Sequence, residues 1–227
     1  MKLLITENQC KKLFEARKDG FRLDNITAAK DGDERLLYCR DMLGIPCGYG
    51  SSRVVWQLDD DTVLKVAYND SGIAQNLEEI RIARSGTLHF VPKILNGTDE
   101  KNGLWIVTQY VIPALKRDFG KLLRINFDDI ERLVVNVDAR CQRDCNFFIA
   151  MLADKTIDEV CRKYKRNRGA VALINDLFRL KSEHHQYIGD LSRIENWGMA
   201  LEKGKPRMVV LDSGFSEEVY NQFYKRR

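Results

Sequence analysis

Two places in the first half of the chain have residue types that suit the binding of a phosphate group. The stretch Gly48-Tyr49-Gly50-Ser51 lies between apolar residues, and its glycines let backbone N–H groups approach phosphate oxygen atoms without a Cβ in the way. Lys65 lies in the apolar run 63–67, where a lysine is costly to bury unless an anion pairs with it. The alternatives are a glycine-rich start of a hairpin for the first stretch and an outward-pointing side chain for Lys65.

Acidic side chains occur further along the chain in settings that could complete such a site. Glu78 and Glu79 follow Lys65 in a predicted helix, and either carboxylate could pair with the lysine. Asp190 lies between a predicted helix and a predicted strand. Asp212, in the sequence Asp212-Ser213-Gly214, comes at the end of an apolar strand.

Hydrophobic periodicity predicts the elements that must position the first group of residues. A capped amphipathic helix is expected over residues 7–18 and a second helix over 33–43, and the two would form an extension that packs on the hairpin that follows. Apolar alternation predicts that hairpin, with strands at 54–58 and 63–67 around a turn at 59–61. The remaining elements are a helix at 72–84, a strand region at 90–95 and a strand at 104–111.

The second half of the chain has mainly helical periodicity. Helices are predicted over 127–152, 156–164 and 169–185, and a short strand pair follows at 196–200 and 208–211. Strands first and helices afterwards predict an α+β fold with two lobes. The predicted divisions are a helical extension at 1–47, a first lobe at 48–112 and a second lobe at 113–227.

Composition limits the class of protein. The chain has 227 residues, of which 44% are hydrophobic and 31% charged, as in an ordinary soluble globular protein. The net charge of +4 does not indicate a nucleic-acid partner, and the basic run 162–168 is interpreted as a solvated helix end or loop. The six cysteines lack the paired spacings of a zinc site, and Cys141 and Cys145 are expected to pack as small hydrophobic residues. No apolar stretch suits a signal peptide or a membrane span, so a soluble cytoplasmic protein without a membrane partner is expected.

The order of these motifs resembles the protein-kinase superfamily, including its aminoglycoside-phosphotransferase-like and atypical branches. The organisation is similar to the minimal early serine/threonine protein kinases of T7-type phages. The resemblance covers about residues 48–215, whereas 1–47 and about 117–170 match no motif. It implies a two-lobed kinase-like fold, with a small β-rich N-terminal lobe and a truncated, mostly helical C-terminal lobe, and a location in the host cytoplasm if the chain is phage-encoded.

The resemblance implies how ATP would be bound. Gly48 and Gly50 would cover the phosphates, Lys65 would contact them while pairing with a glutamate of the next helix, and the backbone after Thr108 would hold the adenine. The residues implied in ATP binding are Gly48, Tyr49, Gly50, Ser51, Lys65, Glu78, Glu79, Gln109, Tyr110 and Val111.

The resemblance also implies which residues act on the phosphate. Asp190 would serve as base or orienter for the acceptor hydroxyl, with Lys65 as the second catalytic residue. Asn196 and Asp212 would bind Mg²⁺, because this ion prefers carboxylate and amide oxygen atoms.

Four departures separate this chain from the kinase pattern. Arg53 replaces the third glycine of the phosphate loop, Ile188 replaces the histidine before the catalytic aspartate, and Ser213 replaces the phenylalanine of the Asp-Phe-Gly motif. Five residues, where the family usually has four, separate Asp190 from Asn196. The extra residue is either a bulge that keeps Asn196 aligned or a sign that Glu195 or Asn196 serves imperfectly.

These observations predict an ATP- and Mg²⁺-dependent phosphotransferase that phosphorylates serine or threonine hydroxyls of proteins, with a host protein as one candidate substrate. One alternative is a pseudokinase that keeps the fold and acts by binding a partner. The others are a small-molecule kinase of the aminoglycoside-phosphotransferase type and a nucleotidyl transferase that binds ATP in a flipped orientation. The substrate and the oligomeric state do not follow from the sequence.

Overall fold

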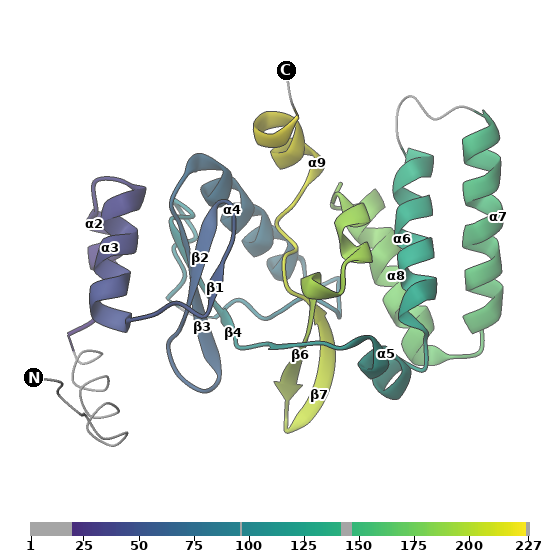
Figure 1. The fold of residues 1–227 in the computed structure, drawn as a ribbon, viewed down its shortest axis with the longest axis horizontal. Helices are drawn as coiled ribbons and strands as arrows, with labels where there is room; N and C mark the ends of the chain where they lie inside the picture. The colour runs from purple at the N-terminus through teal and green to yellow at the C-terminus, as the bar shows by residue number, and fades with distance from the viewer. Residues whose placement is uncertain (1–19, 96, 142–146, 226–227) are drawn as a thin grey trace, which may run out of the picture. The chain divides into compact units, whose positions relative to one another are not determined.

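The computed structural model describes residues 20–95, 97–141 and 147–225. The chain divides into two compact units: unit 1 comprises Met1–Leu77 and Ile94–Tyr110, and unit 2 comprises Glu78–Lys93 and Val111–Arg227. Each unit has helices and its own antiparallel sheet, so the predicted α+β class is confirmed (Figure 1). The helix predicted at 7–18 lies outside the described residues.

Unit 1 is built on a four-stranded sheet in the order β1-β2-β3-β4. The predicted hairpin is confirmed as the antiparallel pair of β2 and β3, with β1 beside β2 and β4 beside β3. In this register Lys65 of β3 lies opposite Val55 of β2 and Ile106 of β4. The strands are β1 (Gly48–Tyr49), β2 (Arg53–Gln57), β3 (Thr62–Ala67) and β4 (Trp105–Gln109).

Two helices cover one face of this sheet. The predicted α3 (Gly32–Leu43) is confirmed, and it follows a shorter helix, α2 (Leu23–Ala28), that was not predicted because six residues hold too little periodicity to read. Ile26 and Leu43 are buried with Trp56 of the sheet in one apolar cluster. The described helices before the glycine loop therefore pack on the hairpin, as expected for the helix at 33–43.

In the segment between β3 and β4, one predicted element is confirmed and one is wrong. Helix α4 (Asp70–Ser85) matches the prediction, and its residues from Glu78 onward belong to unit 2. The strand region predicted at 90–95 is wrong, since it forms only the single bridge of Ile94 with Thr108. Pro92 lacks the N–H that a ladder needs, and the division between the units falls within this stretch.

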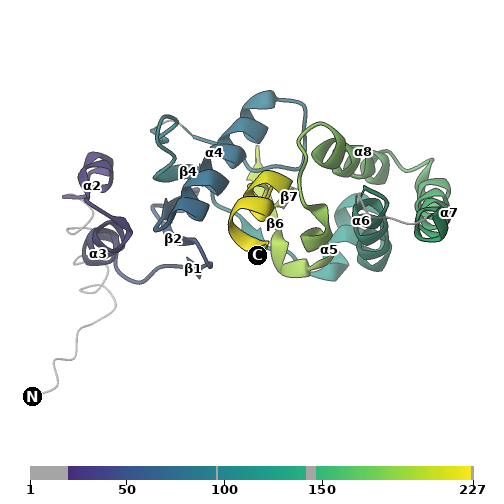
Figure 2. The ribbon, with the colours of Figure 1, turned by 90° about the horizontal axis from the view of Figure 1, so that it is seen from above.

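Unit 2 is mainly helical, and Figures 1 and 2 show α6, α7 and α8 lying alongside one another. The stretch predicted to be helical over 127–152 contains α6, described to Cys141, and the start of α7, described from Phe147; residues 142–146 lie outside the described part. Helix α7 also runs without a break through the predicted gap between 152 and 156. The helix predicted to reach residue 185 ends at Ser182, and His185 has a left-handed backbone conformation with φ 52°. The helices are α5 (Lys116–Leu123), α6 (Phe127–Cys141), α7 (Phe147–Tyr164) and α8 (Arg168–Ser182).

The three-stranded sheet of unit 2 joins β5, which precedes α5, to the two strands that follow α8 and flank the C-terminal motifs. Its order is β5-β6-β7, and the predicted strand pair is confirmed as β6 and β7. Lys203 and Gly204 connect them with φ of 51° and 73°, the positive values that a tight two-residue hairpin turn needs. The elements are η1 (Ile188–Ser192), η2 (Ile194–Asn196), β5 (Ile112–Pro113), β6 (Trp197–Glu202), β7 (Lys205–Val210), α9 (Glu217–Val219) and η3 (Tyr220–Tyr224).

Candidate functional site

Asp190 and Asn196 are joined directly by hydrogen bonds. The Asn196 side-chain amide donates to Oδ2 of Asp190 at 2.7 Å and to its backbone carbonyl at 2.8 Å. Both amide hydrogens therefore point to Asp190, and the amide oxygen is the atom that Asn196 can offer to a cation. Arg193 approaches the other carboxylate oxygen at 3.7 Å, but its side chain is 65% exposed, so this ion pair is weak.

The extra residue between Asp190 and Asn196 is absorbed by local helical geometry. Two 3₁₀ turns, η1 and η2, fill the loop, and Arg193 between them has an extended conformation. Asn196 reaches Asp190, whereas Glu195 is exposed. The longer spacing therefore still brings Asn196, and not Glu195, into contact with Asp190.

Asp212 is held beside this pair by the end of the β6–β7 hairpin. The Leu211 N–H donates to the Asn196 carbonyl at 2.8 Å, which extends the ladder by one bond. The Asp212 side chain then accepts the Gly214 N–H at 3.3 Å in a local turn. Asp190 and Asp212 also line the same small cavity. Unit 2 thus brings together the three predicted polar residues.

The cavity between these carboxylates contains an unusual serine. Ser213, which replaces the kinase phenylalanine, is only 3% exposed, and its hydroxyl oxygen has no hydrogen-bond partner in the described part of the chain. The cavity measures about 10 Å³, close to the space that one ordered water needs. A buried hydroxyl without a partner costs free energy, so a small polar ligand here would be stabilising.

The loop before Asn196 is anchored in the core of unit 2. Trp197 is fully buried, and its Nε1 donates to the Leu191 carbonyl at 2.8 Å. Its ring packs edge-on against Phe119 at 5.1 Å between centroids. Trp197 is therefore a structural anchor in the core, and it fixes the loop on a rigid surface.

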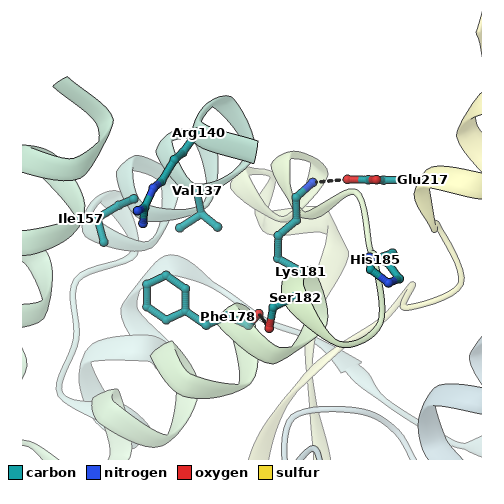
Figure 3. Close-up of a pocket in the computed structure, with 8 residues that line it drawn as sticks. All are labelled: Val137, Arg140, Ile157, Phe178, Lys181, Ser182, His185 and Glu217. Carbon is teal, nitrogen blue, oxygen red and sulfur yellow. Dashed lines mark hydrogen bonds and ion pairs between the residues drawn. The ribbon is translucent and has the colours of Figure 1, made fainter. Parts of the chain in front are cut away.

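An ionic network that includes two buried charges lies next to Asp190 in the fold, and no sequence motif predicted it. Asp138 of α6 accepts the Gly189 N–H at 2.8 Å and pairs with Lys181 of α8 at 2.7 Å. Lys181 also pairs with Glu217 at 2.6 Å, as Figure 3 shows. Burial alone would lower the pKa of Lys181, but its hydrogen bonds to the two carboxylates raise that pKa above its ordinary value. The only sequence signal was a charged residue on the apolar face of each helix.

The glycine loop of unit 1 is fixed by side chains around it. Gly50 donates its N–H to the Arg53 carbonyl at 2.8 Å and accepts from the Tyr68 hydroxyl. Arg53 is 7% exposed and donates to Asn76 at 3.0 Å, so the residue that replaces the third glycine is structural. A Cβ at Gly48 would meet only ordinary contacts. The fold therefore does not require glycine there. Tyr49 and Ser51 are exposed.

Lys65 is buried within the sheet of unit 1. Its neighbours Leu64 and Val66 point into the cluster with α3, so Lys65 lies on the other face of β3. It is 8% exposed, which excludes the alternative of a solvent-exposed side chain. Lys65 forms an interaction within the fold, as does the 1% exposed Glu79.

The predicted glutamates and adenine-binding residues differ in their surroundings. Glu78 accepts from Arg81 at 2.6 Å and from Gln186 at 2.8 Å, both within unit 2, so its carboxylate has other partners. Tyr110 donates its N–H to the Asp61 carbonyl at 2.6 Å, so this backbone donor, one of the groups expected to contact adenine, already has a partner within the protein. Gln109 ends β4 in unit 1. Val111 belongs to unit 2, where Gly198 leaves room for its side chain.

The residues of unit 2 fit a magnesium ion by their chemistry. Asp190 and Asp212 supply carboxylate oxygen atoms and Asn196 an amide oxygen, whereas Mg²⁺ commonly uses one or two carboxylates together with phosphate oxygens and water. No group of three His, Cys, Asp or Glu side chains able to hold a metal occurs among the described residues. Two carboxylates and one amide oxygen form a partial set of the kind that Mg²⁺ completes with phosphate oxygens and water.

Comparison of the chain with protein-family models, with curated proteins and with solved structures finds no match. Within the described ranges, no helix has the length and apolar character needed to cross a membrane. The chemistry of the site therefore rests on the residues and their geometry.

Proposed function

We propose that this chain is an ATP- and Mg²⁺-dependent phosphotransferase that acts on serine or threonine hydroxyls of proteins. The observation that carries the proposal is the pairing of Asn196 with Asp190 beside Asp212, despite the altered spacing. The proposal includes a correspondence of units 1 and 2 to the small and large lobes of a minimal protein kinase.

Unit 1 offers the residue types that this function needs for a nucleotide. Gly48 and Tyr49 form β1, Gly50 and Ser51 lead from it to β2, and Lys65 is a buried cation on β3, the next strand of the sheet. Glycine backbone and lysine side chains are both common phosphate ligands. The two candidate glutamates lie in unit 2: Glu78 is bonded to Arg81 and Gln186, and Glu79 is 1% exposed.

The proposed reaction transfers the γ-phosphoryl group of ATP. The acceptor oxygen forms a bond to the γ-phosphorus, the bond from this phosphorus to the bridging oxygen of ADP breaks, and the hydroxyl proton passes to Asp190. Asn196 orients the Asp190 carboxylate through the 2.7 Å hydrogen bond. Asp212 and the Asn196 amide oxygen would hold Mg²⁺, which neutralises charge on the phosphate oxygens when bound.

A pseudokinase is the second candidate, and one observation favours it. Both oxygens of the Asp190 carboxylate have protein neighbours, Asn196 at 2.7 Å and Arg193 at 3.7 Å. A catalytic base must be free to take a proton from the acceptor. If these contacts persist with nucleotide bound, the chain would bind ATP without efficient transfer.

Thermal unfolding with ATP and Mg²⁺ tests the binding step. A ligand at 100 times its dissociation constant should raise the free energy of unfolding by about 2.7 kcal/mol. Asp212→Asn should reduce this gain, whereas Asp158→Asn, which removes an exposed carboxylate paired with Arg162, should leave it unchanged. No Mg²⁺-dependent stabilisation of the wild-type chain would exclude the enzyme.

Transfer of labelled phosphate separates the remaining candidates. Label from γ-labelled ATP should enter serine or threonine of lysate proteins with the wild-type chain but not with Asp190→Ala. Binding without transfer would identify a pseudokinase, and transfer to aminoglycosides or small alcohols a small-molecule kinase. Incorporation of label from the α-phosphate would indicate nucleotidyl transfer.

A further inference from the structure

A buried lysine connects the two segments of unit 2 that flank Asp190 and Asp212. Lys181, near the end of α8, lies 2.7 Å from Oδ1 of Asp138 and 2.6 Å from Oε1 of Glu217. The side chains of Lys181 and Asp138 are 8% and 7% exposed. Because an unpaired charge is costly in the interior, such a lysine strongly restrains both of its partners.

The Asp138 end of this network fixes the backbone next to Asp190. Oδ2 of Asp138 accepts the Gly189 N–H at 2.8 Å. A Cβ at position 189 would lie 2.7 Å from the same oxygen, so only glycine lets the carboxylate come this close. The requirement is steric, since Gly189 is not among the residues with positive φ.

The Glu217 end fixes the segment that follows Asp212. The Glu217 N–H donates to the His185 carbonyl at 2.8 Å, and the Tyr187 N–H donates to the Phe215 carbonyl at 2.9 Å. The rings of Tyr187 and Phe215 meet edge-on at 5.8 Å. The chain after Asp212 therefore runs beside the chain before Gly189, and Lys181 lies where the two are joined.

We propose that Asp138, Lys181 and Glu217 form a positioning clamp that sets the relative placement of the Asp190 and Asp212 carboxylates. The inference rests on the proposed phosphotransferase function. The three residues act through the backbone at Gly189 and through the segment 215–217, so they are positioning residues and not catalytic ones.

A clamp of this kind has a distinct kinetic consequence. If the two segments separate, Mg²⁺ binding and the transfer step weaken, whereas contacts with the acceptor elsewhere remain. Loss of outer residues that orient metal ligands typically costs 10–100-fold in activity or metal affinity. We expect a lower kcat and a higher Mg²⁺ concentration for half-maximal rate, with an unchanged KM for the acceptor.

The clamp borders a pocket that makes a rescue experiment feasible. Lys181 and Glu217 line a pocket of about 440 Å³, with an apolar wall that includes Val137, Ile157 and Phe178 (Figure 3). In Lys181→Ala, a small alkylammonium ion could therefore enter and take the place of the lost ammonium. Ethylammonium should restore part of the kcat of this variant and leave the wild type unchanged.

Glu217→Ala compared with Glu218→Ala is the primary test. Glu218 is the exposed neighbour of Glu217 in the sequence, and its replacement by alanine removes the same charge. Glu217 is 44% exposed, and its loss leaves Lys181 paired with Asp138, so Glu217→Ala should fold. We expect at least a tenfold fall in kcat and a raised Mg²⁺ requirement for Glu217→Ala only.

A second variant and a second measurement keep the inference testable without activity. Asp138→Asn with Lys181→Met removes both buried charges, while the amide oxygen of residue 138 can still accept the Gly189 N–H. Amide hydrogen exchange at 186–190 and 212–217 should be faster in this variant and in Glu217→Ala than in Glu218→Ala. Unchanged exchange in both variants overturns the clamp, whether or not the wild type is active. If the wild type is active, variants with the wild-type kcat and Mg²⁺ requirement also overturn it. An inactive wild type with faster exchange in the variants refutes the phosphotransferase and retains the structural clamp.

Discussion

Asn196 donates both hydrogens of its side-chain amide to Asp190, one to Oδ2 at 2.7 Å and one to the backbone carbonyl at 2.8 Å. The two residues are six positions apart, and two 3₁₀ turns bring them together. This contact both closes the loop and orients the carboxylate, so its removal should affect stability and activity together.

Asn196→Ala should therefore lower the free energy of unfolding by about 1–3 kcal/mol, because two hydrogen bonds each contribute roughly 0.5–1.5 kcal/mol. It should also reduce kcat on the order of 10–100-fold, since the carboxylate loses its orienting partner. Urea unfolding and phosphate transfer measure the two effects. Glu195→Ala, at an exposed neighbour, is the control. Equal behaviour of the two variants would contradict the importance of the contact.

Gly189→Ala should destabilise the chain, because its Cβ would lie 2.7 Å from the Asp138 carboxylate. Strain of this kind costs about 1–3 kcal/mol. Gly120→Ala is the matched control: a Cβ there meets nothing within 4 Å on helix α5, and alanine should stabilise that helix by up to about 1 kcal/mol. Melting temperatures should move in opposite directions. A stable Gly189→Ala chain would mean that Asp138 can move away without cost.

Lys65→Met should weaken ATP binding at least tenfold, which corresponds to about 1.4 kcal/mol less stabilisation by saturating nucleotide. The reason is that Lys65 is a buried cation on the strand next to the glycine loop. Lys101→Met removes an exposed lysine of the same unit and should retain the shift. If ATP stabilises both variants equally, Lys65 does not contact phosphate.

Stability should fall as the pH drops below about 6.5, the ordinary pKa of histidine. Burial of His184 in unit 2, with the nearby Arg81 as a second cause, lowers the pKa of its imidazole. A base with a lowered pKa in the folded state binds protons more readily when unfolded, so its contribution is present above pH 6.5 and is lost on acidification.

Urea unfolding at pH 7.5 and pH 5.5 measures this effect. His184→Gln should lose less stability between the two pH values than the wild type does. His185→Gln, at the exposed neighbour, is the control for replacing a histidine by glutamine in this segment. If His184→Gln loses as much stability between the two pH values as the wild type does, other groups cause the pH dependence.

The sequence by itself determined most of the local structure. Alternation around Asp59–Asp61 is sufficient for the β2–β3 hairpin, and Lys203 and Gly204 supply the turn of the β6–β7 hairpin. These elements depend on neighbouring residues, so periodicity and turn chemistry describe them well. The order of the polar motifs follows from the sequence alone for the same reason.

Only the tertiary structure decided how those motifs are held. Whether Lys65 pointed to solvent or inward depended on which face of the sheet is covered, and whether Asn196 or Glu195 meets Asp190 depended on the two 3₁₀ turns. Asp138, Lys181 and Glu217 come from three separate segments, and no local pattern connects them. Lys181 and Asp138 are buried, so loss of either charge would leave the other unpaired in the interior, and burial is a property of the packed chain that one-dimensional periodicity does not record.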